Sequence, residues 1–163
     1  MLSSGKMGWS VEIVGSTSTN DIVAVKDLWN EYWRSSGLSL DFQGFGEELR
    51  EFPGKYVQPS GCLFLVRIDG RPAATAAFHR LHAHACEAKY LYVRPVYRNR
   101  GVASALIAEL VLKARRSGYR ELFGDTLPIM ASALELYRKL GFVEVGPYSD
   151  TPTPHAIYLR LAL

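Results

Sequence analysis

Residues 91–103 read LYVRPVYRNRGVA, and this stretch decides the fold. An apolar run that predicts a strand ends at Val93, because Pro95 has no amide hydrogen with which to continue strand pairing. A basic loop follows, and Gly101 then opens a helix that carries apolar residues around most of its surface as far as Arg116. A helix of that kind packs against a sheet, so the stretch predicts a strand, a basic loop and a buried helix in succession.

The start of this helix is a candidate binding site for an anion. Its first turn leaves backbone N–H groups without partners inside the helix, and the helix dipole places positive potential there. Gly101 and Ala103 lack the side-chain bulk that would keep a phosphate from the backbone. Arg98 and Arg100 add positive charge, but the loop has neither the Lys-Ser/Thr pair of a P-loop nor the three glycines of a dinucleotide fingerprint. From the residues alone, a diphosphate site and an ordinary solvated helix start both stay open.

The rest of the chain predicts an α+β fold, with strands before and after the central helix rather than the regular alternation of a doubly wound fold. Alternating or continuous apolar runs predict strands at residues 9–14, 62–68, 72–79, 85–93, 121–125, 142–145 and 156–163. Apolar residues at helical spacing predict helices at residues 20–37, 45–52, 101–116 and 128–140. Asn20 or Asp21 is the expected cap of the first helix, and Pro128 is expected to open the last one. Asp69-Gly70 suits the positive φ angles of a tight hairpin turn.

Composition limits the number of domains and the kinds of partner. The 163 residues are enough for one domain, expected over residues 9–163, with residues 1–8 as a disordered leader or expression remnant. A net charge of +3 is too small for a dedicated nucleic-acid binder. No run approaches the ~20 apolar residues of a membrane span, and residues 1–10 lack the apolar core of a secretion signal. Cys62 and Cys86 lie in apolar segments without metal-ligand spacing, so we expect reduced thiols, no metal site and a cytoplasmic protein.

Two segments resemble the sequence motifs of the GNAT superfamily. Residues 98–103, Arg-Asn-Arg-Gly-Val-Ala after a Tyr-Val-Arg-Pro strand end, resemble motif A, whose pattern is Arg/Gln-x-x-Gly-x-Gly/Ala. Residues 125–142, which end in Leu-Tyr-Arg-Lys-Leu-Gly-Phe, resemble motif B. The likeness covers roughly residues 62–163, and the first third of the chain matches only in its strand-helix-helix outline. It implies the GNAT fold, a mixed central sheet of about seven strands that is splayed in the middle and flanked by about four helices.

The resemblance implies that acetyl-coenzyme A is a co-substrate. It would lie in the splay, between the strand that ends at Val93 and the strand over residues 122–125. Its pyrophosphate would bind the backbone amides of residues 100–103, and its pantetheine arm would run beside Val93 like an added strand. Its thioester carbonyl would accept a hydrogen bond from the Leu91 amide, which a nearby bulge frees from strand pairing.

One position departs from the motif. Met130 stands where many relatives carry an asparagine that contacts the pantetheine arm, and methionine cannot replace that hydrogen bond. Thr126 or Ser132 is therefore expected to supply it. The implied coenzyme-binding residues are Leu91, Val93, Arg98, Asn99, Arg100, Gly101, Val102, Ala103, Thr126 and Ser132.

The resemblance also implies a base and an acid for the attack of an amine on the thioester. The positions that often hold the base are Glu87 and Lys89, and Glu87 is the candidate because a carboxylate can take the ammonium proton through water. In a regular strand Glu87, Lys89, Leu91 and Val93 share one face, with Glu87 roughly 13 Å from Leu91. Glu87 as an exposed partner of Lys89, and assistance by Lys89 or water alone, stay open. Tyr137 is the candidate acid for the leaving thiolate, although an aromatic on an apolar helix face is also typical of a core.

The sequence does not identify the acceptor, which is expected to be a small-molecule or peptide amine. Aromatic residues in the region that usually lines the acceptor pocket of this fold are Trp29, Tyr32, Trp33 and Phe42. A loop over residues 148–154 either borders that pocket or only connects two strands. Acidic residues on the same side, which indicate either a cationic amine or a solvated helix surface, are Asp41, Glu47, Glu48 and Glu51.

The sequence therefore predicts an N-acetyltransferase that acts on neither nucleic acid nor membrane. One alternative is a catalytically inactive acyl-coenzyme A-binding sensor that keeps the cleft, and another is a nucleotide-binding module that uses the same helix start. Dimers are common among similar proteins, so a homodimer is an expected oligomeric state beside the monomer. His79, His82 and His84 are not joined by a Cys or carboxylate at ligand spacing, so exposed turn histidines are expected rather than a metal site.

Overall fold

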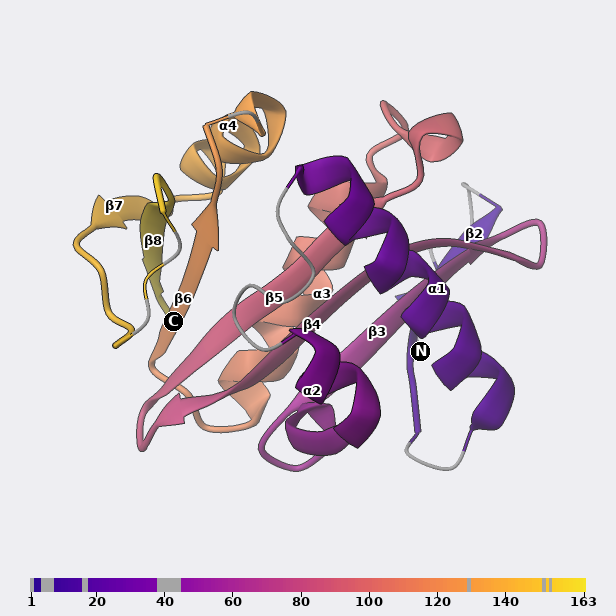
Figure 1. Ribbon diagram of the computed structural model, residues 1–163, viewed down its shortest axis with the longest axis horizontal. Coiled ribbons are helices and arrows are strands. Elements are labelled where there is room, and N and C mark those ends of the chain that lie inside the picture. Colours follow the sequence, from indigo (N-terminus) through magenta and orange to yellow (C-terminus); the bar gives the residue numbers. More distant parts are fainter. Residues whose placement is uncertain are drawn as a thin grey trace.

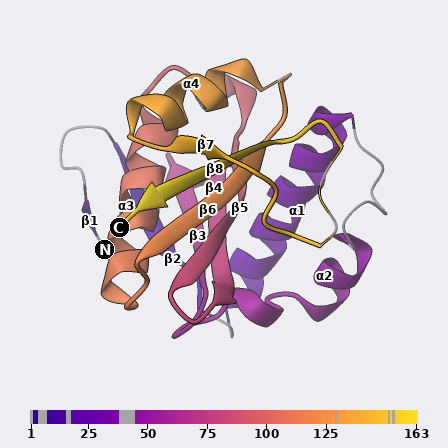
Figure 2. The same ribbon diagram turned by 90° about the vertical axis from the view of Figure 1, so that its left-hand side faces the viewer.

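The computed structural model describes residues 2–3, 8–15, 18–37, 45–128, 130–150, 152 and 154–163. A single sheet runs through the described chain, with helices packed on both of its faces (Figure 1). The helices α1 (Thr19–Ser36) and α2 (Phe45–Glu51) lie on one side of the sheet (Figure 2). The helices α3 (Val102–Arg116) and α4 (Ala131–Lys139) lie on the other side. Among the described residues, no helix has the length and apolar character needed to cross a membrane.

The sheet has eight strands in the order β1-β2-β3-β4-β5-β6-β8-β7. They are β1 (Leu2–Ser3), β2 (Trp9–Ile13), β3 (Cys62–Ile68), β4 (Arg71–His82), β5 (Ala85–Val93), β6 (Glu121–Thr126), β7 (Val143–Val145) and β8 (Ile157–Ala162). Neighbouring strands are antiparallel except β5 and β6, which are parallel. The predicted mixed α+β sheet is confirmed, and the two-residue β1 adds an edge strand beside β2. A leader over residues 1–8, outside a single domain, stays a prediction.

The four predicted α-helices are present, and the described connections include the short 3₁₀ helices η2 (Gly54–Tyr56) and η3 (Pro95–Tyr97). Two helix starts differ from the prediction. The residue before α1 is Ser18, so Asn20 and Asp21 lie inside the first turn instead of capping it. The helix α4 begins after Pro128, because the Met130 amide first donates to the Leu127 carbonyl at 2.8 Å and closes a separate turn.

The strands β5 and β6 pair over three residues and then separate. The pairs are Ala85 with Glu121, Cys86 with Leu122 and Glu87 with Phe123. Beyond Glu87, no pairing joins the described remainder of β5 to that of β6, although β5 continues to Val93 and β6 to Thr126. The predicted splay is confirmed, and it opens at the carboxyl ends of two parallel strands, where ligand clefts form in sheets of this kind.

Two apolar cores lie on opposite faces of the sheet. The α3 core includes Phe78, Leu106 and Leu122, and Leu91 and Val93 pack against it. The α1 core contains Val25, Leu28, Trp29, Trp33, Phe45, Tyr90 and Tyr92, among others. Cys62 and Cys86 are buried free thiols, as predicted, and burial raises the pKa of the Cys62 thiol to about 11.

The strand β5 contains a bulge at Tyr90 and Leu91. Thr75 pairs with Tyr92 and Ala77 with Lys89, so two residues of β5 lie opposite Ala76 alone. Tyr90 has a φ of 56°, in the left-handed region that L-residues rarely adopt. The bulge expected near Leu91 is confirmed.

The bulge also overturns one expectation, that Glu87, Lys89, Leu91 and Val93 share a face. An extra residue moves every later side chain of a strand to the opposite face. Lys89 Nζ lies 3.8 Å from Glu87 Oε1, so these two side chains share one side of the sheet. Leu91 and Val93 instead pack on the α3 side.

Candidate active site

The loop before α3 has the geometry expected of an anion-binding helix start. Gly101 precedes the helix with a φ of 77° and a ψ of 8°, and no side chain caps the first turn. Asn99 also has a positive φ, of 61°. A Cβ atom on Gly101 would meet nothing within 4 Å apart from its two chain neighbours, so the space beside this residue is open. The backbone amides of this turn can therefore reach a ligand without rearrangement.

The side chains of the two predicted arginines of this loop lie beside tyrosine rings. Arg98 Nε donates to the Val93 carbonyl at 2.9 Å, and its guanidinium lies 5.8 Å from the centre of the Tyr92 ring. The Arg100 guanidinium lies 5.8 Å from the Tyr97 ring centre. Both residues are exposed, so they supply positive potential at the mouth of the site.

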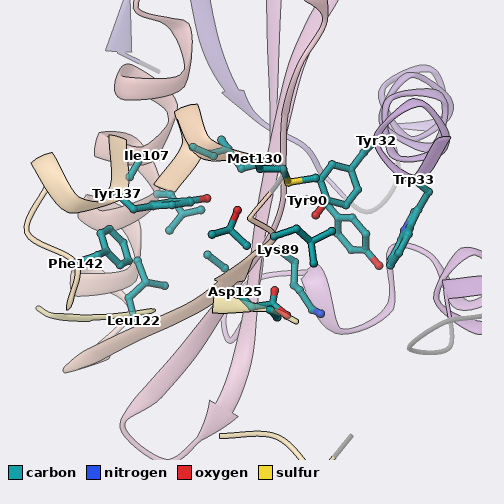
Figure 3. A pocket seen from close by; sticks show the side chains of 17 residues that line it. Tyr32, Trp33, Lys89, Tyr90, Ile107, Leu122, Asp125, Met130, Tyr137 and Phe142 are labelled. Atoms are coloured by element: carbon teal, nitrogen blue, oxygen red, sulfur yellow. The ribbon is translucent and has the colours of Figure 1, made fainter. Parts of the chain in front are cut away.

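A pocket between the separated parts of β5 and β6, here called the splay pocket, extends from α1 to α4 (Figure 3). It is lined by Tyr32, Trp33, Ala88, Lys89, Tyr90, Leu91, Ile107, Leu110, Leu122, Asp125, Thr126, Leu127, Met130, Ala133, Tyr137, Phe142 and Ala156. Of the predicted coenzyme residues, Leu91 and Thr126 line this pocket. Ser132 is exposed on α4 and does not line it.

Thr126 is the buried polar group of the splay pocket. Its side chain belongs to a residue that is 6% exposed, and its Oγ1 has no hydrogen-bond partner within the described part of the chain. A buried hydroxyl without a partner costs free energy, so Thr126 remains a candidate for a ligand contact. Met130 lies in the wall of the same pocket, and the replacement of the missing asparagine by Thr126 or Ser132 stays a prediction.

Tyr137 lies on α4, and its hydroxyl points into the splay pocket (Figure 3). The ring contacts Phe142 edge-on, with ring centres 5.2 Å apart. Burial raises the pKa of Tyr137, and the nearby Tyr32 and Asp125 raise it further. The phenol therefore keeps its proton at neutral pH and is available as a hydrogen-bond donor.

A second and more open pocket of about 480 Å³, here called the loop pocket, lies beside the loop before β8. It is lined by Glu48, Lys55, His79, Leu81, His82, Glu87, Lys89, Asp125, Tyr148, Ser149, Asp150, Pro152 and Tyr158. Four described residues of the 148–154 loop line this pocket, whereas Tyr32 and Trp33 line the splay pocket, so the expected place of the loop beside the acceptor stays a prediction. Lys89 and Asp125 line both pockets, so the splay pocket and the loop pocket meet at these two side chains.

Glu87 is a buried residue in the wall of the loop pocket, which contradicts the alternative of an exposed partner for Lys89. It is 8% exposed, and its Oε1 lies 2.9 Å from His79 Nε2 and 3.8 Å from Lys89 Nζ. Burial alone would raise the pKa of Glu87 from its ordinary 4.5, but the His79 hydrogen bond, the Lys89 charge and the Tyr148 hydroxyl outweigh burial and hold it at about 2. The Tyr148 hydroxyl lies nearby without a hydrogen bond of good geometry to any described residue.

The histidines divide into two groups. His82 and His84 are exposed near the β4–β5 turn, as expected. His79 is 7% exposed and bonded to Glu87, so the expectation of an exposed turn histidine is wrong for this residue. The described residues contain no group of three His, Cys, Asp or Glu side chains that could hold a metal ion.

The aromatic residues predicted for the acceptor pocket are separated by the structure. Trp29 is fully buried, stacks on Tyr90 with ring centres 3.8 Å apart, and lines neither pocket. Tyr32 and Trp33 line the splay pocket, and Phe42 lies outside the described residues. Of the acidic residues on that side, Glu48 lines the loop pocket, where it accepts hydrogen bonds from the Tyr56 and Tyr90 hydroxyls.

Sequence reasoning did not assign a role to Asp125 or pair His79 with Glu87. The sequence showed Asp125 only as part of a motif. Its position where the splay pocket and the loop pocket meet depends on the separation of β6 from β5. His79 and Glu87 face each other because the β4–β5 register pairs them. The sequence indicated this pair only through the two predicted strands and the turn between them, which place residues of one strand opposite residues of the other.

Comparisons with known proteins find similar sequences and similar structures. A family model described as the acetyltransferase (GNAT) family matches residues 22–142. An uncharacterized N-acetyltransferase of Schizosaccharomyces pombe is 32% identical over 145 residues, which cover 88% of this chain and 89% of that protein. An acetyltransferase structure from Streptococcus agalactiae superposes with a TM-score of 0.78 at 16% identity, covering 96% of this chain and 99% of the other. A Salmonella typhimurium protein solved with its cofactor acetyl-coenzyme A has a TM-score of 0.69 at 16% identity, with 95% and 94% covered.

Proposed function

Because the chain belongs to the GNAT acetyltransferase family, we propose that it transfers the acetyl group of acetyl-coenzyme A to the amine of a small hydrophilic molecule or a peptide. The observation that carries this proposal is the meeting of two pockets at Lys89 and Asp125, with Tyr137 on one side and Glu87 on the other. The binding of acetyl-coenzyme A by a structural neighbour supports the same coenzyme here. A cytoplasmic location and a homodimer stay predictions.

The open helix start and the splay pocket together would hold the coenzyme. The amides of residues 100–103 would bind the pyrophosphate, supported by the positive potential of Arg98 and Arg100. Thr126 Oγ1 would bond to the pantetheine arm, which runs along β5 beside Val93 and Leu91. Coenzyme binding contributes an activated acyl group held as a thioester.

The protein groups around the junction would then manage the protons. Glu87 would take the ammonium proton through a water molecule and release it to solvent through the loop pocket. The Leu91 amide, displaced from strand pairing by the bulge, would donate to the carbonyl oxygen while the C–N bond forms. Tyr137 would donate its proton to the sulfur while the C–S bond breaks, and the second proton lost by the nitrogen would restore the Tyr137 phenol, so that the products are an amide and a free thiol.

The acceptor class follows from the lining of the loop pocket. Its side chains are mainly charged or polar, with carboxylates from Glu48, Glu87, Asp125 and Asp150. A pocket of this kind favours hydrophilic amines over arylalkylamines, because an apolar acceptor would desolvate these groups without replacing their hydrogen bonds.

A thiol-release assay with a panel of amines tests the proposed function. The panel contains spermidine, L-lysine, L-glutamate, a lysine-containing peptide and phenethylamine, each incubated with enzyme and acetyl-coenzyme A. We expect thiol release and acetylated product, detected by mass, with at least one hydrophilic amine and less with phenethylamine. Stabilisation by acetyl-coenzyme A without turnover on any amine would favour the sensor, and stabilisation by nucleotides alone would favour the nucleotide-binding alternative.

Replacing Gly101 with alanine tests the pyrophosphate site. Alanine disfavours the left-handed conformation, so the first-turn amides should lose their alignment. We expect the KM for acetyl-coenzyme A to rise about tenfold, as for the loss of one hydrogen bond to a charged group. Gly118→Ala is the matched control, because Gly118 has a φ of 91° and equally open space but lies at the other end of α3. If both variants raise the KM alike, the proposed phosphate site is wrong.

Replacing Thr126 with valine separates a ligand contact from a structural role. Valine keeps the shape but removes a buried hydroxyl without a partner, so the free energy of unfolding of the free enzyme should stay constant or rise by about 1 kcal/mol. The KM for acetyl-coenzyme A should rise about fivefold, because one neutral hydrogen bond is lost. Chemical unfolding and steady-state kinetics measure the two effects. A normal KM in Thr126→Val with a raised KM in Ser132→Ala would assign the contact to Ser132.

A further inference from the structure

His79 and Glu87 form a buried pair in the wall of the loop pocket. They are direct cross-strand partners in the β4–β5 register, and both residues are more than nine-tenths buried. His79 Nε2 lies 2.9 Å from Glu87 Oε1. The pairing of the strands, rather than a flexible loop, therefore sets the distance between the imidazole and the carboxylate.

The hydrogen-bond partners of His79 determine the protonation of its ring. Nδ1 lies 2.8 Å from the Arg80 carbonyl oxygen, which can only accept a hydrogen bond. Nε2 faces the Glu87 carboxylate, which also only accepts while it is ionised. Both ring nitrogens therefore face acceptor oxygens, an arrangement that suits a ring with two donors.

Other charged groups around the pair act on Glu87 in both directions, because cations favour its ionised form and carboxylates oppose it. The Tyr56 ring packs edge-on against the His79 ring, with centres 5.6 Å apart, and Lys89 adds positive charge beside Glu87. The remaining charged or titratable side chains that line the same pocket are Glu48, Lys55, His82, Asp125, Tyr148, Asp150 and Tyr158. Glu48 is itself bonded to Lys55 at 3.1 Å, so its charge is largely compensated.

We propose that His79 is a positioning residue that keeps Glu87 ionised and fixed toward the acceptor. The proton of the amine then moves through Glu87 to solvent, and Glu87 returns to its carboxylate form. The proposal rests on acetyl transfer as the proposed function. The proton moves from the ammonium through water to Glu87 and on to solvent, while His79 keeps both of its ring protons. Acidification then slows the reaction through protonation of the amine alone.

Removal of His79 should favour the neutral form of Glu87. Burial by itself favours the neutral form of a carboxyl group. Without the imidazolium, the pKa of Glu87 should rise from about 2, because burial is the largest influence on this group and opposes ionisation, while Lys89 and Tyr148 still favour the carboxylate. Glu87 should then become protonated, and stop acting as a proton acceptor, at a higher pH than in the wild type.

Nuclear magnetic resonance tests the charge state of the pair without any acceptor. In wild-type enzyme labelled with ¹³C-glutamate and ¹⁵N-histidine, we expect the Glu87 carboxyl to stay ionised well below pH 4.5 and His79 to show two protonated ring nitrogens at neutral pH. In His79→Phe, which keeps an aromatic ring against Tyr56, the Glu87 carboxyl should titrate at a clearly higher pH than in the wild type. A Glu87 titration that is the same in both proteins, or a single protonated nitrogen on His79, would overturn the proposal.

The pH profile tests the consequence for catalysis. With the best acceptor of the amine panel, log kcat/KM should fall with a slope of one below the pKa of that amine in the wild type. In His79→Phe the slope should increase to two below the pKa of Glu87, because two groups must then be deprotonated. A slope of one throughout would contradict the role of His79. His84→Gln, an exposed histidine outside both pockets, is the control and should reproduce the wild-type profile.

A second variant and a measurement that needs no acceptor keep the proposal testable. If His79→Phe does not fold, His79→Gln replaces it, and because its amide can still donate one hydrogen bond to Glu87, we expect a smaller rise in the same titration. If no amine of the panel is acetylated, the proposed function fails, while the two resonance measurements still decide whether His79 holds Glu87 in its charged form.

Discussion

Replacing Glu87 with glutamine is expected to lower kcat for acetyl transfer about a hundredfold and to leave the KM for acetyl-coenzyme A unchanged. Glutamine has nearly the shape of glutamate and can still accept the hydrogen bond from His79, but it cannot take a proton. The expected loss lies at the low end for a general base, because a carboxyl whose pKa is about 2 is only weakly basic. Steady-state kinetics at a pH below the pKa of the amine would show the full effect.

Acid unfolding provides a second readout for this variant. The folded-state pKa of Glu87 is about 2 and lies below its ordinary 4.5, so ionised Glu87 stabilises the fold above pH 4.5. That contribution is lost as the pH falls from 4.5 through about 2. The difference in free energy of unfolding between wild type and Glu87→Gln should therefore be largest near neutral pH and should shrink on acidification.

A matched control separates catalysis from the loss of an ion pair. Glu12 accepts a hydrogen bond from Arg67 at 2.9 Å and lines neither pocket. Glu12→Gln should therefore affect stability slightly and kcat not at all. Equal kcat values for wild type and Glu87→Gln would show that water alone, or Lys89, assists deprotonation.

The parts of the fold that were predicted correctly depend on local signals. Asp69 and Gly70 have φ angles of 51° and 76°, as an Asp-Gly hairpin turn requires, and the strands on both sides are where the apolar runs place them. Gly37 ends α1 with a φ of 71°, and Gly101 precedes α3 with a φ of 77°. Each of these features needs only a few adjacent residues, so the sequence alone indicates them.

The site was predicted less completely because it depends on strand register and packing. The bulge at Tyr90 was expected, but not its consequence that Glu87 and Leu91 lie on opposite faces of the sheet. That consequence follows from the register between β5 and β4, which contains one extra residue in β5. The His79–Glu87 pair likewise arises from that register. Trp29 is an aromatic at helical spacing whose place in the core, not in a pocket wall, is decided by its stacking on Tyr90. Long-range contacts of this kind leave little trace in a single sequence.

Replacing Tyr137 with phenylalanine is expected to lower kcat about a hundredfold, with the KM for acetyl-coenzyme A nearly unchanged. Phenylalanine keeps the edge-on contact with Phe142, so α4 should stay in place and the loss should come from the hydroxyl alone. Burial, Tyr32 and Asp125 all raise the pKa of Tyr137, so the proton is present throughout the working pH range of the enzyme. The fall in kcat should therefore be the same at every pH tested.

Varying the pKa of the leaving thiol tests whether the Tyr137 hydroxyl acts on the sulfur. A thiol of lower pKa needs less help to leave, so an acetyl thioester of an acidic thiophenol should lose less rate in Tyr137→Phe than acetyl-coenzyme A does. Tyr119→Phe is the control, because the Tyr119 hydroxyl donates to the Ser60 carbonyl at 2.5 Å and its removal should reduce stability without changing kcat. An unchanged kcat in Tyr137→Phe would show that the thiolate departs without a protein donor, and Tyr137 would then be only a packing residue of the splay pocket.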